Sequence, residues 1–148
     1  MSATSTGRTP GTKVDSAAGA RAHAEATVRA RWDSAGRTPH QQDMIDLSLV
    51  VSELVTNAIR HGDGLAGFDA WTTEEGVRIA VHDHSDVIPE AAGATGSLPV
   101  AHQGSGYGWP LVIKLARDID IRRSPGGGKT ISVLVPLRDA PTSRAHRG

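Results

Sequence analysis

Three polar residues recur at helical spacing in the middle of the chain. Glu53 and Asn57 lie four positions apart and Arg60 three further on, so a helix places all three on one face. A carboxylate can act as a general base, and an amide oxygen is a hard ligand suited to Mg²⁺. The same spacing also describes an ordinary solvated stripe opposite an apolar one. Spacing alone leaves both interpretations open.

Asp83 is the second candidate. It continues the alternation of Val77, Ile79 and Val81, so its side chain is expected on the apolar side of a strand. A carboxylate on an apolar face is costly unless it is hydrogen-bonded. It is therefore either a strand-end acid that caps a turn or reaches solvent, or an acceptor for a ligand donor such as an exocyclic amine.

A glycine cluster is the third candidate. Gly104, Gly106 and Gly108 directly precede a helix expected to begin near Trp109. Closely spaced glycines let backbone N–H groups approach a ligand, and a helix N-terminus adds positive potential. The cluster is either an anion site or a flexible loop before a helix. It is not a dinucleotide-binding fingerprint, because no strand immediately precedes it and Trp109 stands where the third glycine belongs.

Two further motifs do not support a site. The run from Gly126 to Thr130 (GGGKT) resembles the end of a phosphate-binding P-loop, but Arg123 stands where the first glycine is required and a strand-like run follows. His82 and His84 could share a strand face, yet no third ligand is indicated, so the sequence does not predict a metal centre there.

Hydrophobic periodicity predicts the elements that position these residues. Apolar side chains recur at helical spacing from Ile45 to Ile59, and Gly62 supplies a stop. Helices are expected at 17–32, 41–60 and 109–117, and strands at 68–73, 77–83, 119–123 and 130–137. The stretch 84–106 has no clear period, and a segment of this length inside a compact domain is typical of a lid or binding loop.

Composition narrows the class of protein. Sixteen Lys and Arg balance sixteen Asp and Glu, so the net charge is zero and gives no bulk attraction to nucleic acid or an anionic membrane. The absence of cysteine excludes a disulfide scaffold and a thiolate metal site. Neither a membrane span nor a signal peptide is recognisable. We expect a cytoplasmic protein with disordered tails at 1–18 and 140–148 around one domain at 19–139.

Taken in order, the motifs resemble a known family. The run from Ser52 to Gly62 (SELVTNAIRHG) looks like the N box of the gyrase and histidine-kinase ATPase superfamily, and within it the anti-sigma factor serine kinases and short actinobacterial ATP-binding regulators. Positions 81–83 stand where that family has its first glycine box, 106–112 resemble the second, and 128–130 match the closing motif. The resemblance covers roughly residues 40–137.

The resemblance implies an α/β fold, a two-layer sandwich with helices on one face of a mixed, mostly antiparallel sheet. ATP would lie between the long helix and the lid. Asn57 would bind Mg²⁺, and Glu53 would orient or deprotonate the attacking hydroxyl. Asp83 would accept from the adenine amine, with Thr130 supporting it.

The phosphates would be bound elsewhere in the same site. Gly104, Gly106 and Gly108 would offer backbone N–H groups to them, and Arg60 would reach one as well. The sequence departs from the family at the first glycine box, because Asp83 is followed by His-Ser-Asp-Val and both glycines are missing.

Two functions follow from the resemblance. The first is an anti-sigma factor with protein serine/threonine kinase activity, which uses Mg-ATP to phosphorylate an anti-sigma factor antagonist. The alternative is a non-catalytic ATP-binding switch that chooses its protein partner without phosphoryl transfer. The expected partners are a sigma factor and the antagonist, with neither nucleic acid nor membrane, and the resemblance leaves a homodimer open.

Overall fold

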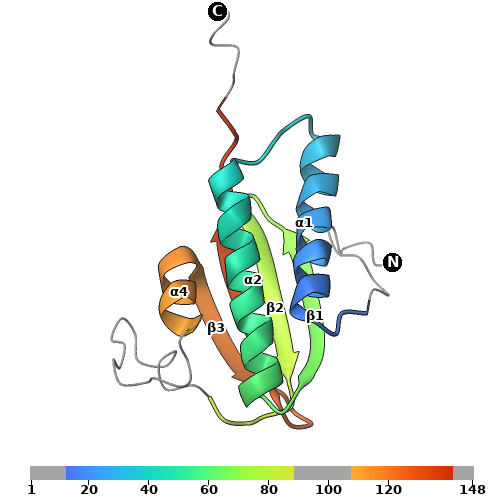
Figure 1. Cartoon of the computed structure of the whole chain (residues 1–148), viewed down its shortest axis with the longest axis vertical. Coiled ribbons are helices and arrows are strands. Elements are labelled where there is room, and N and C mark those ends of the chain that lie inside the picture. Colours follow the sequence, from blue (N-terminus) through green and yellow to red (C-terminus); the bar gives the residue numbers. More distant parts are fainter. Residues whose placement is uncertain (1–12, 89–107, 142–148) are drawn as a thin grey trace, which may run out of the picture.

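The computed structural model describes residues 13–88 and 108–141. Within them, three helices cover one face of a four-stranded sheet (Figure 1), which confirms the two-layer α/β fold. The elements are α1 (Ala17–Ser34), α2 (Gln41–His61), β1 (Leu65–Thr72), β2 (Gly76–Asp83), α4 (Gly108–Leu115), β3 (Arg117–Arg123) and β4 (Lys129–Pro136). The strand order is β1-β2-β4-β3, and every described strand pair is antiparallel.

Local sequence explains where the two long helices begin and end. The Ser16 hydroxyl accepts a hydrogen bond from the Gly19 N–H and caps α1, and the His40 side chain does the same for α2. The N–H of Gly62 bonds to the Ala58 carbonyl at the C-terminus of α2. One face of α2 is buried over its length, but Ile45, Leu49 and Ile59, which the sequence pattern assigned to the apolar set, are exposed.

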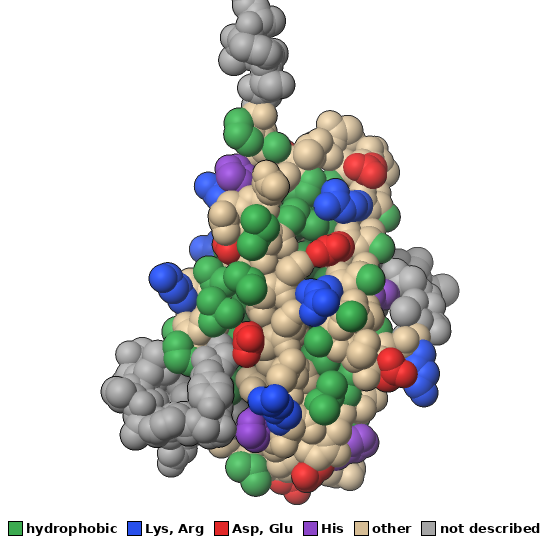
Figure 2. All heavy atoms as spheres, viewed as in Figure 1, with side chains coloured by type: hydrophobic (Ala, Val, Ile, Leu, Met, Phe, Trp, Pro, Cys, Tyr) green, Lys and Arg blue, Asp and Glu red, His purple; other side chains and the backbone are tan. Residues whose placement is uncertain are grey.

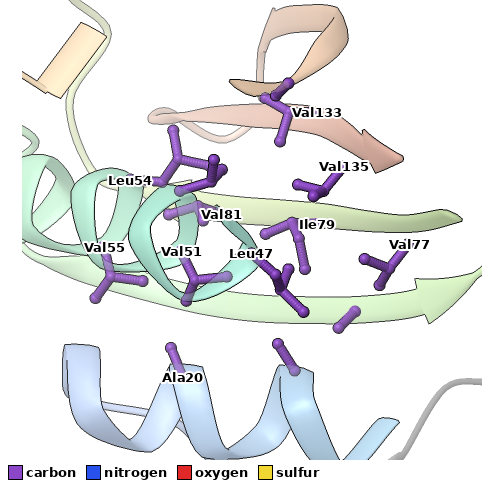
Figure 3. Close-up of a cluster of buried hydrophobic side chains, with 14 of the residues drawn as sticks. Ala20, Leu47, Val51, Leu54, Val55, Val77, Ile79, Val81, Val133 and Val135 are labelled. Carbon is purple, nitrogen blue, oxygen red and sulfur yellow. The ribbon is translucent and has the colours of Figure 1, made fainter. Parts of the chain in front are cut away.

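The core is aliphatic and lies between the helices and the sheet. Alternate residues of the two central strands point at α2, where they meet its buried face and the small residues of α1 (Figure 3). The largest fully buried side chains are Leu47, Leu54, Ile79, Val28, Val50, Val51, Val55, Val77, Val112, Val133 and Val135. Asp83 belongs to the same inward-facing set of β2, so the sheet determines where this candidate site residue lies.

Several predicted boundaries shift. β1 begins at Leu65 rather than at residue 68, with an irregular register between Leu65 and Gly67, and α4 ends at Leu115 because Arg117 opens β3. Val14 packs against the core, so the described part of the predicted N-terminal tail belongs to the fold. The Ala140 N–H bonds to the Thr38 carbonyl, which attaches the chain beyond β4. Most of the predicted lid at 84–106 lies outside the described residues, since these leave out 89–107.

None of the helices in the described ranges is long and apolar enough to cross a membrane.

Candidate functional site

Glu53 and Asn57 lie on the flank of α2 that faces away from α1. The hydroxyls of Ser48 and Ser52 bond to α1, at 2.7 and 2.9 Å. Because each residue turns an α-helix by about 100°, Glu53 and Asn57 fall on the other side of α2. Figure 1 shows α4 on that side. The helix therefore directs this pair toward α4 and the segment that leads into it.

The Asn57 amide contains an orphaned polar atom. Its Nδ2 is buried and has no hydrogen-bond partner. Buried polar groups are nearly always paired, so this unpaired donor is unusual among the described residues. The neighbouring Glu53 carboxylate is half-buried, and we find no hydrogen bond or ion pair from it to other described residues. Arg60, one turn further on, is exposed.

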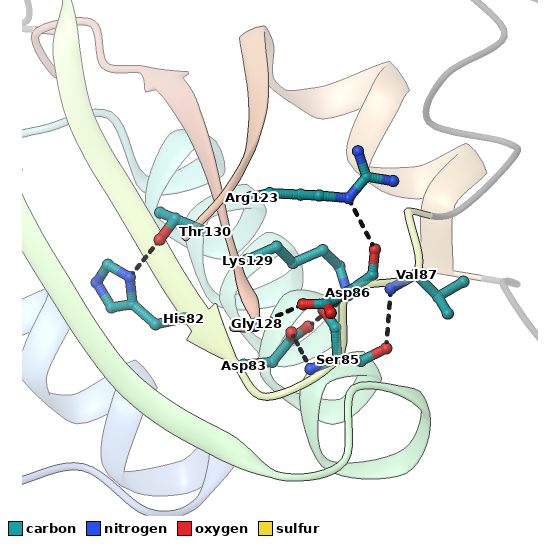
Figure 4. A network of polar contacts seen from close by, with 9 residues as sticks. All are labelled: His82, Asp83, Ser85, Asp86, Val87, Arg123, Gly128, Lys129 and Thr130. Carbon is teal, nitrogen blue, oxygen red and sulfur yellow. Dashed lines mark hydrogen bonds and ion pairs between the residues drawn. The ribbon is translucent and has the colours of Figure 1, made fainter. Parts of the chain in front are cut away.

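Asp83 is buried at the end of β2, and its carboxylate is fully engaged (Figure 4). Its Oδ2 lies 2.9 Å from Lys129 Nζ, and its Oδ1 accepts a hydrogen bond of 3.0 Å from the Ser85 N–H. Lys129 Nζ also donates to the Ser85 carbonyl at 3.2 Å. The side chains of Asp83 and Lys129 are only 5% and 3% exposed. Asp83 is therefore a turn cap and half of a buried ion pair, and it does not reach solvent.

The Asp83 carboxylate rests against the C-terminal end of α2. A Cβ added to Gly62 would collide with the carboxylate, so only glycine fits beneath it. The His84 N–H also bonds to the Gly62 carbonyl at 2.9 Å. Asn57 lies five residues before Gly62, which is about 7.5 Å along the helix axis. The end of α2 therefore brings Asp83 and Asn57 into one region.

The expected support of Asp83 by Thr130 is wrong. In the β2–β4 register Asp83 pairs with Lys129, and Thr130 pairs with His82. Neighbouring strand residues face opposite sides of a sheet, so the Thr130 side chain points away from Asp83. Its hydroxyl lies 2.7 Å from His82 Nδ1, and His82 Nε2 lies 3.0 Å from Asp69. Sequence reasoning missed Lys129, although the parity of β4 could have identified it.

A family model for the histidine kinase-like ATPase domain matches residues 15–134. The chain belongs to this family. No curated protein and no solved structure matches the sequence. Family membership supports ATP binding. The fold places Glu53 and Asn57, two of the residues predicted for that site, along one side of α2.

In this histidine kinase-like ATPase, side chains replace the missing glycines of the first box. The Ser85 hydroxyl accepts a hydrogen bond from the Val87 N–H, and Asp86 Oδ1 accepts one of 2.7 Å from the Gly128 N–H. Arg123 donates to the Asp86 carbonyl (Figure 4). The segment after β2 is therefore fastened to the β3–β4 turn rather than left open to a nucleotide.

The glycine cluster is only partly described. Gly108 is the first residue of α4, which packs against α2 and buries Trp109 and Val112. Gly104 and Gly106 lie outside the described residues, and their expected contact with phosphates remains a prediction.

The donor set of this ATPase fits a magnesium ion only with help from the nucleotide. The described residues include no group of three or more His, Cys, Asp or Glu that could hold a metal. Mg²⁺ typically takes one or two protein oxygens and completes its shell with water and substrate phosphates. The Asn57 side chain has one amide oxygen that could serve as such a ligand, and its Nδ2, a donor, has no hydrogen-bond partner in the described structure.

Proposed function

We propose that this chain is an ATP-dependent protein serine/threonine kinase that regulates a sigma factor. The observation that carries the proposal is the orphaned Asn57 amide beside a carboxylate that is free among the described residues. A polar helix face with only a structural role is not expected to contain a buried amide that lacks a hydrogen-bond partner. A site for the phosphates and metal of a nucleotide, with a base next to it, accounts for both side chains.

Each residue has a definite task in phosphoryl transfer. The Asn57 amide oxygen would ligate Mg²⁺, which supplies neutralisation of phosphate charge when bound. Glu53 orients the acceptor serine hydroxyl and takes its proton as the oxygen attacks the γ-phosphorus. The new P–O bond forms on the serine, and the bond from phosphorus to the leaving oxygen breaks to release ADP. Arg60, which is exposed, would meet phosphate charge.

The partners follow from the resemblance to anti-sigma factor serine kinases. We propose an anti-sigma factor antagonist as the phosphate acceptor and a sigma factor as the protein that is sequestered. An ATP-dependent switch without transfer is the second candidate. The fastening of residues 84–88 by Ser85 and Asp86 favours that alternative, because it restricts the segment that family members keep rich in glycine.

The first experiment compares Glu53→Gln with the wild-type chain. Calorimetric titration of ATP with Mg²⁺ and then with EDTA measures binding, and transfer is followed with γ-labelled ATP and an antagonist from the same genome. We expect Glu53→Gln to bind ATP with unchanged affinity and to lose at least about a hundredfold in transfer rate, because only the base is removed. Asp46→Asn is the matched control, since Asp46 is an acid two turns earlier on α2 that bonds to Gln42.

Each result separates the candidates. Transfer by the wild-type chain and by Asp46→Asn, but not by Glu53→Gln, supports the kinase. ATP binding without transfer in all three proteins supports the switch. Absence of binding with or without Mg²⁺ would reject both functions together with every ligand role assigned to α2.

A further inference from the structure

Three polar side chains form a chain of hydrogen bonds on the face of the sheet opposite the helices. His82 Nδ1 lies 2.7 Å from Thr130 Oγ1 (Figure 4), and His82 Nε2 lies 3.0 Å from Asp69 Oδ2. The three residues belong to β1, β2 and β4, so the sheet itself sets their spacing. A hydroxyl, an imidazole and a carboxylate in this order are the parts of an activated nucleophile. The function proposed at α2 uses none of them.

The carboxylate determines which way the two hydrogen bonds run. An ionised carboxylate only accepts hydrogen bonds, so a neutral imidazole holds its hydrogen on Nε2, where Asp69 accepts it. Nδ1 then keeps a lone pair, and the Thr130 hydroxyl must supply the proton between them. The hydroxyl therefore donates to a base, which leaves the lone pairs of its oxygen free to attack.

This face of the sheet is accessible from solvent. The side chains of His82 and Asp69 are 33% and 39% exposed, and Thr130 is half-buried. Gly67 pairs with His82 in the β1–β2 register, and a Cβ there would lie only 3.1 Å from the ring. Glycine therefore gives the imidazole room to lean toward Asp69. A small molecule can approach the three side chains without displacing a helix.

A cation lies beside the hydroxyl. Arg122 is the cross-strand partner of Thr130 in the β3–β4 register, so the two side chains leave the sheet on the same face. The Nε of Arg122 donates to Asp120, and its other four N–H groups have no partner among the described residues. Donors of this kind stabilise the negative charge that develops on a carbonyl oxygen under attack.

We propose that Thr130, His82 and Asp69 form a second reactive site, in which Thr130 takes acyl groups from activated acyl donors such as aryl esters and thioesters. Oγ1 attacks the carbonyl carbon while His82 Nδ1 takes the hydroxyl proton, and Arg122 stabilises the charge on the acyl oxygen. The new C–O bond forms on Thr130, and the bond from the carbonyl carbon to the leaving group breaks. The leaving group departs as an anion, and His82 releases the proton to water. Asp69 is a positioning residue, because it acts only through the ring.

The unmodified chain supplies the first test. It is incubated with p-nitrophenyl acetate, cleaved at arginine, and searched by mass spectrometry for acetyl groups. We expect Thr130 to be acetylated at least about tenfold faster than Ser132, a hydroxyl on the same face of β4 that accepts from Arg78 instead of contacting a histidine. Hydroxylamine treatment of the intact protein should remove the group, because it is an ester. Equal rates at the two hydroxyls, or no acetyl on Thr130, would overturn the inference.

Two histidine variants test the role of the base. His82→Gln keeps a polar side chain but removes the base, so it should lower the rate of Thr130 acetylation by at least about tenfold. His84→Gln, at an exposed histidine two residues further along the chain, is the matched control and should keep the wild-type rate. The wild-type rate in His82→Gln would overturn the inference and leave the three side chains a structural role. If His82→Gln does not fold, the wild-type comparison of the two hydroxyls still decides.

The positioning role of Asp69 is tested through the ring it holds. Asp69→Asn replaces the acceptor with an amide that can donate to Nε2, which moves the ring hydrogen to Nδ1 and blocks the base. We expect nitrogen NMR of His82 to report this change of tautomer, and acetylation of Thr130 to fall with it. Asp69→Glu restores a carboxylate and should recover part of the rate. Unchanged acetylation and an unchanged tautomer in Asp69→Asn would overturn the assignment of Asp69.

Discussion

At the residue scale, the unpaired amide of Asn57 is a local cost to the stability of the folded chain. An unpaired buried polar group costs about 1–3 kcal/mol, and Asn57 Nδ2 is such a group in the described structure. Free protein carries that cost, and a ligand that pairs the amide removes it. Stability and binding should therefore respond in opposite directions to one substitution.

We expect Asn57→Leu to raise the free energy of unfolding of the ligand-free chain by roughly 1 kcal/mol, because it removes an unsatisfied group at similar volume. The same variant should lose the Mg²⁺ dependence of ATP binding. Urea unfolding and calorimetry measure the two effects. Thr56→Leu, at the preceding half-buried position, is the control and should keep Mg²⁺-dependent binding. Easier unfolding of Asn57→Leu than of wild type would contradict the argument.

The residues of the site differ in how far the sequence could predict them. Period-two alternation correctly placed Asp83 inward, because β2 is regular along its whole length. Thr130 was assigned to Asp83 by the resemblance and not by alternation, and the register places Lys129, one residue earlier, opposite Asp83. Neighbouring residues of a strand face opposite sides of the sheet, so a position one residue away directs its side chain to the other face.

Among the elements, the β3–β4 turn is constrained by its approach to the end of β2. Gly128 has a φ of +84°, and a Cβ there would collide with the Asp83 carbonyl. Its N–H also bonds to Asp86. The turn therefore determines where the Asp83–Lys129 pair sits.

Two glycines of this turn provide a matched comparison. We expect Gly128→Ala to lower the free energy of unfolding by about 3 kcal/mol, because it adds a steric overlap to an unfavourable φ. Gly126→Ala should change it by less than about 0.5 kcal/mol, since nothing lies within 4 Å of its added Cβ. Chemical denaturation measures both variants. Equal losses of unfolding free energy in the two variants would show that contact with the end of β2 does not constrain the turn.

Elements with strong periodicity were predicted most accurately. α2 and β2 lie within one residue of their expected ranges, because each has a clear apolar face that packing preserves. β1 was expected to begin three residues too late, since its first residues, Leu65 to Gly67, include an irregular register without alternation. α4 ends at Leu115 instead of the expected residue 117, since Arg117 already belongs to β3.

On the scale of the whole molecule, charge is distributed without a dominant sign. Figure 2 shows Lys and Arg side chains interspersed with Asp and Glu over the helical face, in keeping with a net charge of zero. Individual ion pairs therefore matter more than a long-range field. One of them ties the start of α2 to the chain that leaves β4.

This tie is made by Asp43 and Arg138. The Arg138 side chain and backbone N–H donate to both oxygens of the Asp43 carboxylate, at 2.7 to 3.1 Å. Burial alone would raise the pKa of Asp43, but the hydrogen bonds and the positive charge of Arg138 outweigh it and lower the pKa below 3.8. The folded protein thus favours the charged carboxylate more strongly than the unfolded chain does.

The direction of the pH effect follows from that lowered pKa. A carboxyl group with a lower pKa in the folded state stabilises the protein above its unfolded pKa, and this contribution is lost as the pH falls through the folded value. Asp43→Asn should therefore lower the free energy of unfolding at pH 7 by about 1–2 kcal/mol, and the difference from wild type should shrink below about pH 4. Urea unfolding between pH 7 and pH 3 measures this, with Asp33→Asn, at an exposed acid of α1, as the control. If the difference in unfolding free energy between wild type and Asp43→Asn stays constant down to pH 3, the contact between Asp43 and Arg138 stabilises the fold by packing rather than by charge.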